Sequence, residues 1–160
     1  MFVPFALRNF RSGDFQRLWE IDQQCFVPGI AYTQMDLSGF LAMRGAVALV
    51  AELVPEGVPS EGSPEIVAFI VAYHRKQVGR IITLDVVPQF RRHGLACRLM
   101  RECEQCLRIA GCSAVYLETA VNNEPALRLY QKLGYRVMRT LPGYYTSEDL
   151  DALRMQKQLT

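Results

Sequence analysis

Residues 80–99 read RIITLDVVPQFRRHGLACRL, and this stretch decides the fold. Its first part, residues 80–87, is β-branched and apolar, which indicates a buried strand. Pro88 ends that strand because a proline cannot donate to a sheet ladder. From Gly94 to Ala110 the apolar residues recur at helical spacing. The stretch therefore predicts a strand, a tight basic turn and a helix.

The basic turn, Arg91-Arg92-His93-Gly94-Leu95-Ala96, is suited to bind phosphate. A helix N-terminus presents unpaired N–H groups and the positive end of the helix dipole, which together favour an anion. Gly94 and Ala96 leave little bulk between backbone and ligand, and the two arginines add positive charge. The turn has neither the Gly-Lys-Ser/Thr of a Walker A loop nor the three glycines of a dinucleotide fingerprint. An ordinary turn with its arginines in solvent is the competing interpretation.

Composition and charge describe a globular chain without a membrane or nucleic-acid partner. The 160 residues suit one domain spanning residues 1–160, and a hydrophobic content of 50% excludes a disordered chain. The net charge of +2 is too small to indicate nucleic acid or an anionic membrane. No apolar run reaches the roughly 18 residues that span a bilayer, and the first residues lack a signal-peptide pattern. We therefore expect a cytoplasmic protein.

The cysteines are interpreted as reduced core residues. There are five of them, and an odd number argues against a complete disulfide framework. Cys103 and Cys106 form a C-x-x-C pair, but the pair falls inside the predicted helix. No second pair accompanies it, and His74 and His93 are distant in sequence, so we expect no metal site. Small apolar side chains of the core are the better interpretation.

The other elements follow from the same patterns. Strands are expected at residues 5–9, 46–53, 65–75, 114–120, 135–141 and 151–159, and helices at 12–24, 33–44 and 123–133. Ser12 and Thr33 are expected to cap the first two of these helices. Residues 55–64, rich in proline, glycine and acid, predict a long hairpin loop, and Pro142-Gly143 predicts a turn. This order predicts a mixed α/β (α+β) fold with one sheet.

Two motifs resemble those of the GNAT N-acetyltransferase family. The pattern Arg91-x-x-Gly94-x-Ala96, after a strand ending LDVVP at residues 84–88, resembles the family's acetyl-CoA motif, Arg/Gln-x-x-Gly-x-Gly/Ala. Downstream, LETAVNNEPA at 117–126 and LYQKLGY at 129–135 are also similar to the family. The resemblance is greatest to the RimI-type and related N-alpha-acetyltransferases. It is sharp over residues 80–140 and weaker at both ends.

The resemblance implies a fold and an activity. The family's sheet is mostly antiparallel, with about seven strands and about four flanking helices, and acetyl-CoA lies where the fourth and fifth strands splay apart. The implied reaction transfers an acetyl group from acetyl-CoA to a primary amine without a metal. The implied acceptor is the α-amino group of a protein or peptide, as in the ribosomal-protein-alanine acetyltransferases.

Acetyl transfer needs a neutral amine, a donor to the developing oxyanion and a proton for the thiolate. Glu118 is the candidate base, because a carboxylate in an apolar strand is costly unless it is paired, hydrated or functional, and because the family has a base there. An ion pair is the competing interpretation for Glu118. Asp85 departs from the small residue usual in the family, and is either a second acid acting through water or a surface charge. The resemblance makes Tyr130 the candidate acid, with packing in the core as its alternative.

The resemblance also implies which residues contact the cofactor. They are Leu84, Asp85, Val86, Arg91, Arg92, His93, Gly94, Leu95, Ala96, Cys97, Asn123 and Tyr130. The strand residues among them contact the pantetheine arm through backbone groups, as an added strand would, and the Val86 N–H is the candidate oxyanion donor. Asn123 contacts the cofactor, caps the following helix, or does both.

Five aromatic and proline residues resemble the walls that hold a peptide N-terminus in these enzymes. They are Phe26, Pro28 and Tyr32 in the first loop and Tyr144 and Tyr145 before the last strand. Aromatic packing across a hairpin is the alternative for the paired tyrosines. The same residues weigh against a small cationic acceptor, such as an antibiotic or polyamine, which would recruit acids instead.

A second alternative is an acyl-CoA-binding sensor without catalysis. Such a protein would keep the basic turn at residues 91–96 and lose Glu118 or Tyr130. Both side chains are present, so the sequence favours the enzyme.

Overall fold

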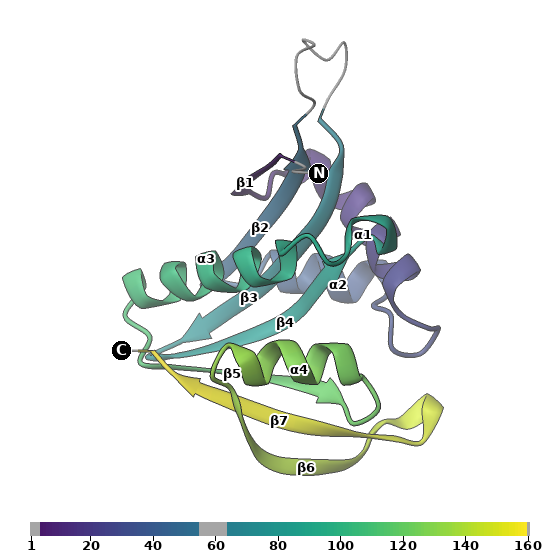
Figure 1. The fold of residues 1–160 in the computed structure, drawn as a ribbon, viewed down its shortest axis with the longest axis vertical. Helices are drawn as coiled ribbons and strands as arrows, with labels where there is room; N and C mark the ends of the chain where they lie inside the picture. The colour runs from purple at the N-terminus through teal and green to yellow at the C-terminus, as the bar shows by residue number, and fades with distance from the viewer. Residues whose placement is uncertain (1–3, 55–63, 160) are drawn as a thin grey trace.

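One seven-stranded sheet organises the protein, in the order β1-β2-β3-β4-β5-β7-β6. The computed structural model describes residues 4–54 and 64–159 (Figure 1). The strands are β1 (Phe5–Asn9), β2 (Ala46–Leu53), β3 (Ile66–Arg75), β4 (Val78–Val86), β5 (Ala114–Ala120), β6 (Arg136–Tyr145) and β7 (Leu150–Gln158). The helices are α1 (Phe15–Cys25), α2 (Gln34–Leu41), α3 (Leu95–Ile109) and α4 (Glu124–Lys132). The expected mixed α/β fold with four helices is confirmed.

The sheet is antiparallel except between its two central strands. β4 and β5 pair in parallel only where Val78–Arg80 meets Ala114–Tyr116, and beyond that point they diverge (Figure 1). A register shift in β4 adds to the divergence, because Ile81 and Thr83 pair with consecutive residues of β3 and leave Ile82 as an extra residue. Such a bulge bends a strand and increases its twist. The expected splay at strands 4 and 5 is therefore confirmed.

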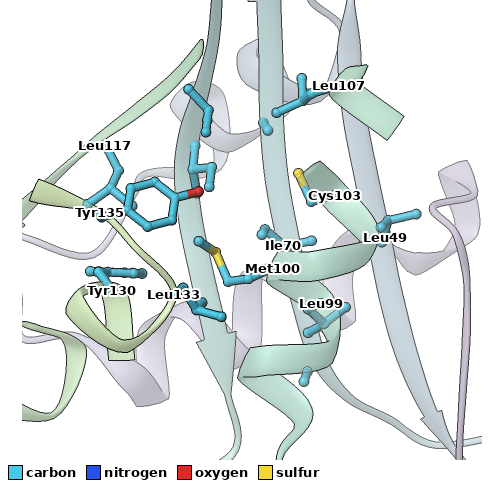
Figure 2. Packing of buried hydrophobic residues seen from close by; sticks show 14 of the residues in the cluster. Leu49, Ile70, Leu99, Met100, Cys103, Leu107, Leu117, Tyr130, Leu133 and Tyr135 are labelled. Atoms are coloured by element: carbon cyan, nitrogen blue, oxygen red, sulfur yellow. The ribbon is translucent and has the colours of Figure 1, made fainter. Parts of the chain in front are cut away.

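The helices cover both faces of the sheet. α3 and α4 lie on one face, and α1 and α2 lie on the other (Figure 1). The apolar stripe of α3 is buried against the sheet and includes Leu99, Met100, Cys103 and Leu107, all fully buried (Figure 2). All five cysteines are free thiols, and Cys103 occupies the core position expected of a small apolar side chain. Within the described residues, no group of three potential ligands could hold a metal ion.

Two predicted helix boundaries are wrong. The first helix begins at Phe15, because residues 12–14 form a 3-10 turn that is closed when Asp14 Oδ2 accepts the Arg11 N–H at 2.8 Å, and Ser12 caps no helix. The second helix ends at Leu41, three residues early, because the chain tightens into i→i+3 bonding there. Its predicted cap is confirmed, since Thr33 Oγ1 accepts the Asp36 N–H at 3.1 Å.

The predicted turn at Pro142-Gly143 is also wrong. β6 continues to Tyr145, which pairs with Leu150, and a register shift absorbs the proline and glycine. The Gly143 N–H is satisfied by Asp151 Oδ1 at 2.8 Å, so the strand needs no turn at this point. The predicted loop at 55–64 lies almost wholly outside the described residues. No helix in the described part of the chain is long and apolar enough to cross a membrane.

Candidate active site

A cavity of about 490 Å³ lies where β4 and β5 diverge. Its walls come from β4 and β5, from the end of α1 and the loop after it, from α4, and from the segment that joins β6 to β7. Backbone and side chains from five parts of the chain therefore meet around one volume. Glu118 and Tyr130, the two residues predicted to be catalytic, both line it.

Glu118 lies in the cavity wall and is held by two arginines. Its side chain is 4% exposed, and its Oε1 accepts from Arg154 Nε at 3.0 Å and from a terminal Arg154 nitrogen at 2.8 Å. Its Oε2 accepts from Arg80 Nε at 3.2 Å. A carboxylate oxygen accepts two hydrogen bonds, so Oε1 is saturated while Oε2 has room for one more. The base and the ion-pair interpretations of Glu118 are therefore compatible, because the paired side chain also lines the cavity.

Tyr130 and Asn123 enter the cavity from α4. Tyr130 is 8% exposed and packs edge-to-face on Tyr135, with 5.9 Å between ring centroids (Figure 2). Burial, and then the nearby Asp85 and Tyr145, raise the pKa of the Tyr130 phenol well above its usual range. Asn123 caps α4, because its Oδ1 accepts the Ala126 N–H at 3.3 Å, and it also lines the cavity.

Three of the five predicted acceptor residues line the cavity. Phe26, Tyr32 and Tyr145 are in the wall, whereas Pro28 and Tyr144 are not. Tyr144 is 41% exposed and its hydroxyl accepts from Arg80 at 3.2 Å, so it contacts the arginine behind Glu118 rather than the cavity. Its ring packs edge-to-face on Tyr145, 5.0 Å away between centroids, which is a contact between neighbours on β6 rather than the packing across a hairpin of the alternative interpretation.

The free edge of β4 presents backbone groups to the gap. The Val87 N–H donates to Val67 O at 2.9 Å, so the residue before it, Val86, directs its backbone groups away from β3. The Val86 carbonyl is taken by side chains instead, Cys25 Sγ at 3.4 Å and Arg91 Nε at 3.0 Å. The same alternation turns Leu84 towards the gap. Leu84 lines the cavity, whereas Val86 is nearly buried and does not.

The basic turn adopts a conformation that needs its glycine. Gly94 is the N-cap of α3 with φ +77°, in the left-handed region, and no side chain caps the helix there. Arg92 also has a positive φ, +66°. Residues 91–94 are exposed, whereas Leu95 is buried in the core and Ala96 and Cys97 pack against it. The first N–H groups of α3 are thus presented beside an exposed, basic turn.

The sequence matches a known family over most of its length. The acetyltransferase (GNAT) family matches residues 15–135. This chain belongs to the GNAT acetyltransferase family. An N-alpha-acetyltransferase of Saccharolobus solfataricus is 32% identical to it, across 97% of this chain and 93% of that protein.

Two solved structures show that the GNAT fold extends over the whole described chain. The ribosomal-protein-S18-alanine N-acetyltransferase of Escherichia coli superposes with a TM-score of 0.82 at 18% identity, across 98% of this chain and 95% of that one. NAA60 of Arabidopsis thaliana, solved in complex with acetyl-CoA, superposes with a TM-score of 0.83 at 23% identity, across 98% and 99%. The protein is an acetyl-CoA-dependent N-acetyltransferase of the GNAT family.

The residues of this acetyltransferase fit the cofactor in two places. The β4 edge presents the backbone groups of Leu84 and the N–H of Val86, and the N-terminus of α3 at Gly94 presents its first N–H groups beside added basic charge. A pantetheine amide suits the first, and a pyrophosphate suits the second.

Asp85 does not behave as either sequence interpretation required. It is 1% exposed, so it is not a surface charge, and it does not line the cavity, so it is not positioned as a base. Its Oδ1 accepts the Thr83 hydroxyl, and its carboxyl group contacts that of Asp22 on α1. Strand alternation explains the orientation, because the residue between Leu84 and Val86 points its side chain to a helix-covered face.

Sequence reasoning missed the arginines of the acetyltransferase site. Arg80 and Arg154 stack near the Tyr116 ring, 5.8 and 5.1 Å from its centroid, and present their guanidinium groups to Glu118. Arg154 lies directly opposite Glu118 in the β5–β7 ladder. A cross-strand opposite-charge pair was the only available signal, and it required the strand register.

Proposed function

We propose that this acetyltransferase acetylates the α-amino group of a protein or peptide by direct attack of the amine on acetyl-CoA. The observation that carries the proposal is the cavity between β4 and β5, in which Glu118 and Tyr130 line walls contributed by different elements. Aromatic side chains from the first loop and from the β6–β7 segment add the rest of the wall. The S. solfataricus relative is itself named an N-alpha-acetyltransferase, which supports the same acceptor class here.

Each proposed residue has one task in the reaction. Acetyl-CoA supplies the acetyl thioester, whose C–S bond breaks as the C–N bond forms. Glu118 Oε2, the oxygen with a free lone pair, accepts the proton that the amine must lose, directly or through water. The Val86 N–H donates to the carbonyl oxygen as charge develops there. Tyr130 donates a hydrogen bond or its proton to the thiolate, and burial, which raises the pKa of the phenol, keeps it protonated for that role.

Cys25 supports direct attack over an acetyl-cysteine intermediate. It is the cysteine that lines the cavity. Burial, and then Asp85, raise its pKa to about 11, and its Sγ already donates to Val86 O. The thiolate rather than the thiol is the nucleophile, so this cysteine is inert near neutral pH.

The charge of the cavity favours a single amine over a polyamine. The wall has two carboxylates: Glu118 is buried and already neutralised by Arg80 and Arg154, and Glu148 is exposed to solvent. A polycation would need additional acids to offset the desolvation of its charges. An α-amine that becomes neutral before attack needs no such additional acids.

Labelled acetyl-CoA tests this proposal. The protein is incubated with peptides that carry a free N-terminus, with N-terminally blocked peptides that contain lysine, and with polyamine and aminoglycoside controls. We expect label on the free N-termini alone. Label restricted to lysine or to small amines would move the activity to those acceptors.

Binding of acetyl-CoA without transfer to any amine would instead support the sensor alternative. Calorimetry on the same preparation distinguishes that outcome from an inactive sample, because a sensor still binds the cofactor.

A further inference from the structure

Two carboxyl groups meet in the interior between α1 and β4. Asp22 on α1 is 0% exposed and Asp85 on β4 is 1% exposed, and their side chains lie within hydrogen-bonding contact. Neither lines the cavity, so neither takes part in the chemistry proposed above. Two buried carboxylates in contact would repel each other strongly, so their arrangement needs an explanation.

The hydrogen bonds of the two carboxyl groups leave one oxygen of each without a partner among the described residues. Asp22 Oδ2 accepts the Tyr32 N–H at 2.7 Å, and Asp85 Oδ1 accepts the Thr83 hydroxyl. The other two oxygens, Asp22 Oδ1 and Asp85 Oδ2, are buried and have no partner among the described residues. An ionised carboxylate can only accept, whereas a protonated one also donates. One proton between these two atoms satisfies both.

We propose that Asp22 and Asp85 share one proton, and that this shared proton positions the acceptor wall by fastening Tyr32 to the strand that binds acetyl-CoA. The first half of the proposal concerns the pair alone. The second half rests on the proposed function, because it treats Tyr32 as part of the acceptor wall.

Tyr32 is fastened on several sides. Its N–H is held by Asp22, and its carbonyl accepts from Trp19 Nε1 at 3.2 Å and from Gln23 Nε2 at 2.8 Å. Its hydroxyl donates across the cavity wall to Ile82 O at 3.3 Å, at the bulge of β4. Asp22 is therefore one of three α1 side chains that hold the tyrosine, and it is the one whose contact with Asp85 connects that hold to β4.

The surroundings retain the proton. Burial raises the pKa of Asp22, and burial together with Asp22 raises the pKa of Asp85 well above its usual range. The other titratable groups near the pair are Cys25 on α1, Tyr32 in the loop, Tyr130 on α4 and Arg91 in the basic turn. Arg91 opposes the rise but is an exposed residue, whereas burial raises the pKa of Cys25, Tyr32 and Tyr130 and keeps these three neutral at pH 7. Loss of the shared proton would place two negative charges in contact and push α1 from β4.

Asp85→Asn is the variant that tests the shared proton. An asparagine has the shape of aspartate and a permanent N–H₂ donor for Asp22 Oδ1, so it replaces the shared proton with one that does not titrate. Asp22→Asn makes the reciprocal change, donating to Asp85 Oδ2, and serves if the first variant fails to fold. Glu20→Gln, on the exposed side of the same helix, is the matched control.

Urea unfolding from pH 5 to 9 tests the shared proton. A free carboxyl group has a pKa of about 3.9, so the unfolded chain has already lost the proton that the folded pair retains. The wild type therefore loses stability as pH rises to the pKa of the pair, and its unfolding constant rises by up to tenfold per pH unit relative to Asp85→Asn. Parallel pH dependence in the wild type and both asparagine variants would refute the shared proton.

Peptide acetylation over the same pH range tests the positioning role. We expect the wild-type KM for peptide to rise severalfold at the pH where the pair loses its proton, with the KM for acetyl-CoA unchanged, and Asp85→Asn to lack that rise. A peptide KM that stays constant through the pH at which the unfolding difference levels off would confirm the proton and overturn the positioning. If no peptide is acetylated at any pH, the proposed function fails, and the unfolding experiment still decides the proton.

Discussion

Glu118 illustrates how neighbours determine what a single side chain can do. Its two arginines occupy three of the roughly four hydrogen-bond sites of a carboxylate, which directs any proton transfer to Oε2. An ion pair and a catalytic role are therefore compatible, provided one oxygen still faces the reacting amine.

Glu118→Gln keeps the shape of the side chain and removes the base. We expect kcat at pH 7 to fall by about 10²- to 10⁴-fold, the usual contribution of a general base, with little change in acetyl-CoA binding. The loss should shrink at high pH, because the substrate α-amine, with a pKa of about 8, is then already neutral. Glu148→Gln, in the same cavity wall, is the control. Near-full kcat for Glu118→Gln would make Glu118 structural.

Tyr130→Phe keeps the buried ring and its packing on Tyr135, and removes the phenolic proton. We expect kcat to fall by about 10²- to 10⁴-fold while acetyl-CoA still binds, since the thiolate loses its acid. The measurement is kcat with saturating peptide, alongside calorimetry for the cofactor. A variant with unchanged kcat would show that Tyr130 has a packing role only.

At the scale of elements, α3 has two glycines with positive φ, one at each end. Gly94 begins the helix at φ +77° and Gly111 follows it at φ +95°, and an added Cβ would meet nothing within 4 Å at either. A side chain would therefore meet open space at both positions, but only Gly94 belongs to the basic turn.

Comparing Gly94→Ala with Gly111→Ala should therefore separate the effect of backbone strain on stability from the effect on acetyl-CoA binding. Each variant is expected to lose about 1 kcal/mol of stability, because alanine tolerates the left-handed region poorly. Only Gly94→Ala should weaken acetyl-CoA, by about tenfold, since it disturbs the turn that presents the N–H groups. Calorimetry on both variants checks this. Equal cofactor affinity in the two would remove the phosphate role of the turn.

The β6–β7 segment offers a similar pair. Tyr145 lines the cavity, whereas its neighbour Tyr144 is 41% exposed and does not. We expect Tyr145→Ala to raise the peptide KM severalfold without changing the KM for acetyl-CoA, and Tyr144→Ala to leave the peptide KM unchanged. An unchanged KM for both variants would place the acceptor elsewhere in the cavity.

At the scale of the whole molecule, the two halves of the sheet share only a short ladder between β4 and β5. A buried network adds to that joint. Glu104 on α3 is 2% exposed, and it accepts from the Tyr135 hydroxyl and from Lys157 Nζ, both at 2.8 Å. Since Tyr135 immediately precedes β6 and Lys157 is in β7, the network ties α3 to the C-terminal strands behind the cavity.

Tyr135→Phe tests this joint. The change removes one donor from a buried carboxylate, so we expect a loss of about 1–3 kcal/mol in the free energy of unfolding. For a chain of this size that corresponds to a fall in Tm of about 2–4 °C per kcal/mol. Acceptor preference among peptides should not change, since Tyr135 does not line the cavity. A Tm equal to that of the wild type would show that Lys157 and Arg108 satisfy Glu104 without the tyrosine.

The sequence by itself determined the elements and the family. Apolar periodicity predicted the strands and helices, and the basic turn after β4 showed the cofactor motif. Both signals could be read from the sequence because each lies within a few neighbouring residues. Glu118, Tyr130 and Asn123 were proposed as site residues because they lie in the stretches 117–126 and 129–135 that resemble the family. The predicted turn at Pro142 failed because cross-strand pairing overrode a local signal.

Only the tertiary structure decided how distant side chains combine. Arg80 and Arg154 reach Glu118 across 38 and 36 positions of sequence, and no local pattern marks such a contact. The sequence left Asp85 as either a surface charge or a second acid, whereas the packing of α1 on β4 places it against Asp22. The physical reason is that ionisation and hydrogen bonding depend on distance and burial in space, whereas periodicity records only which face of an element is apolar.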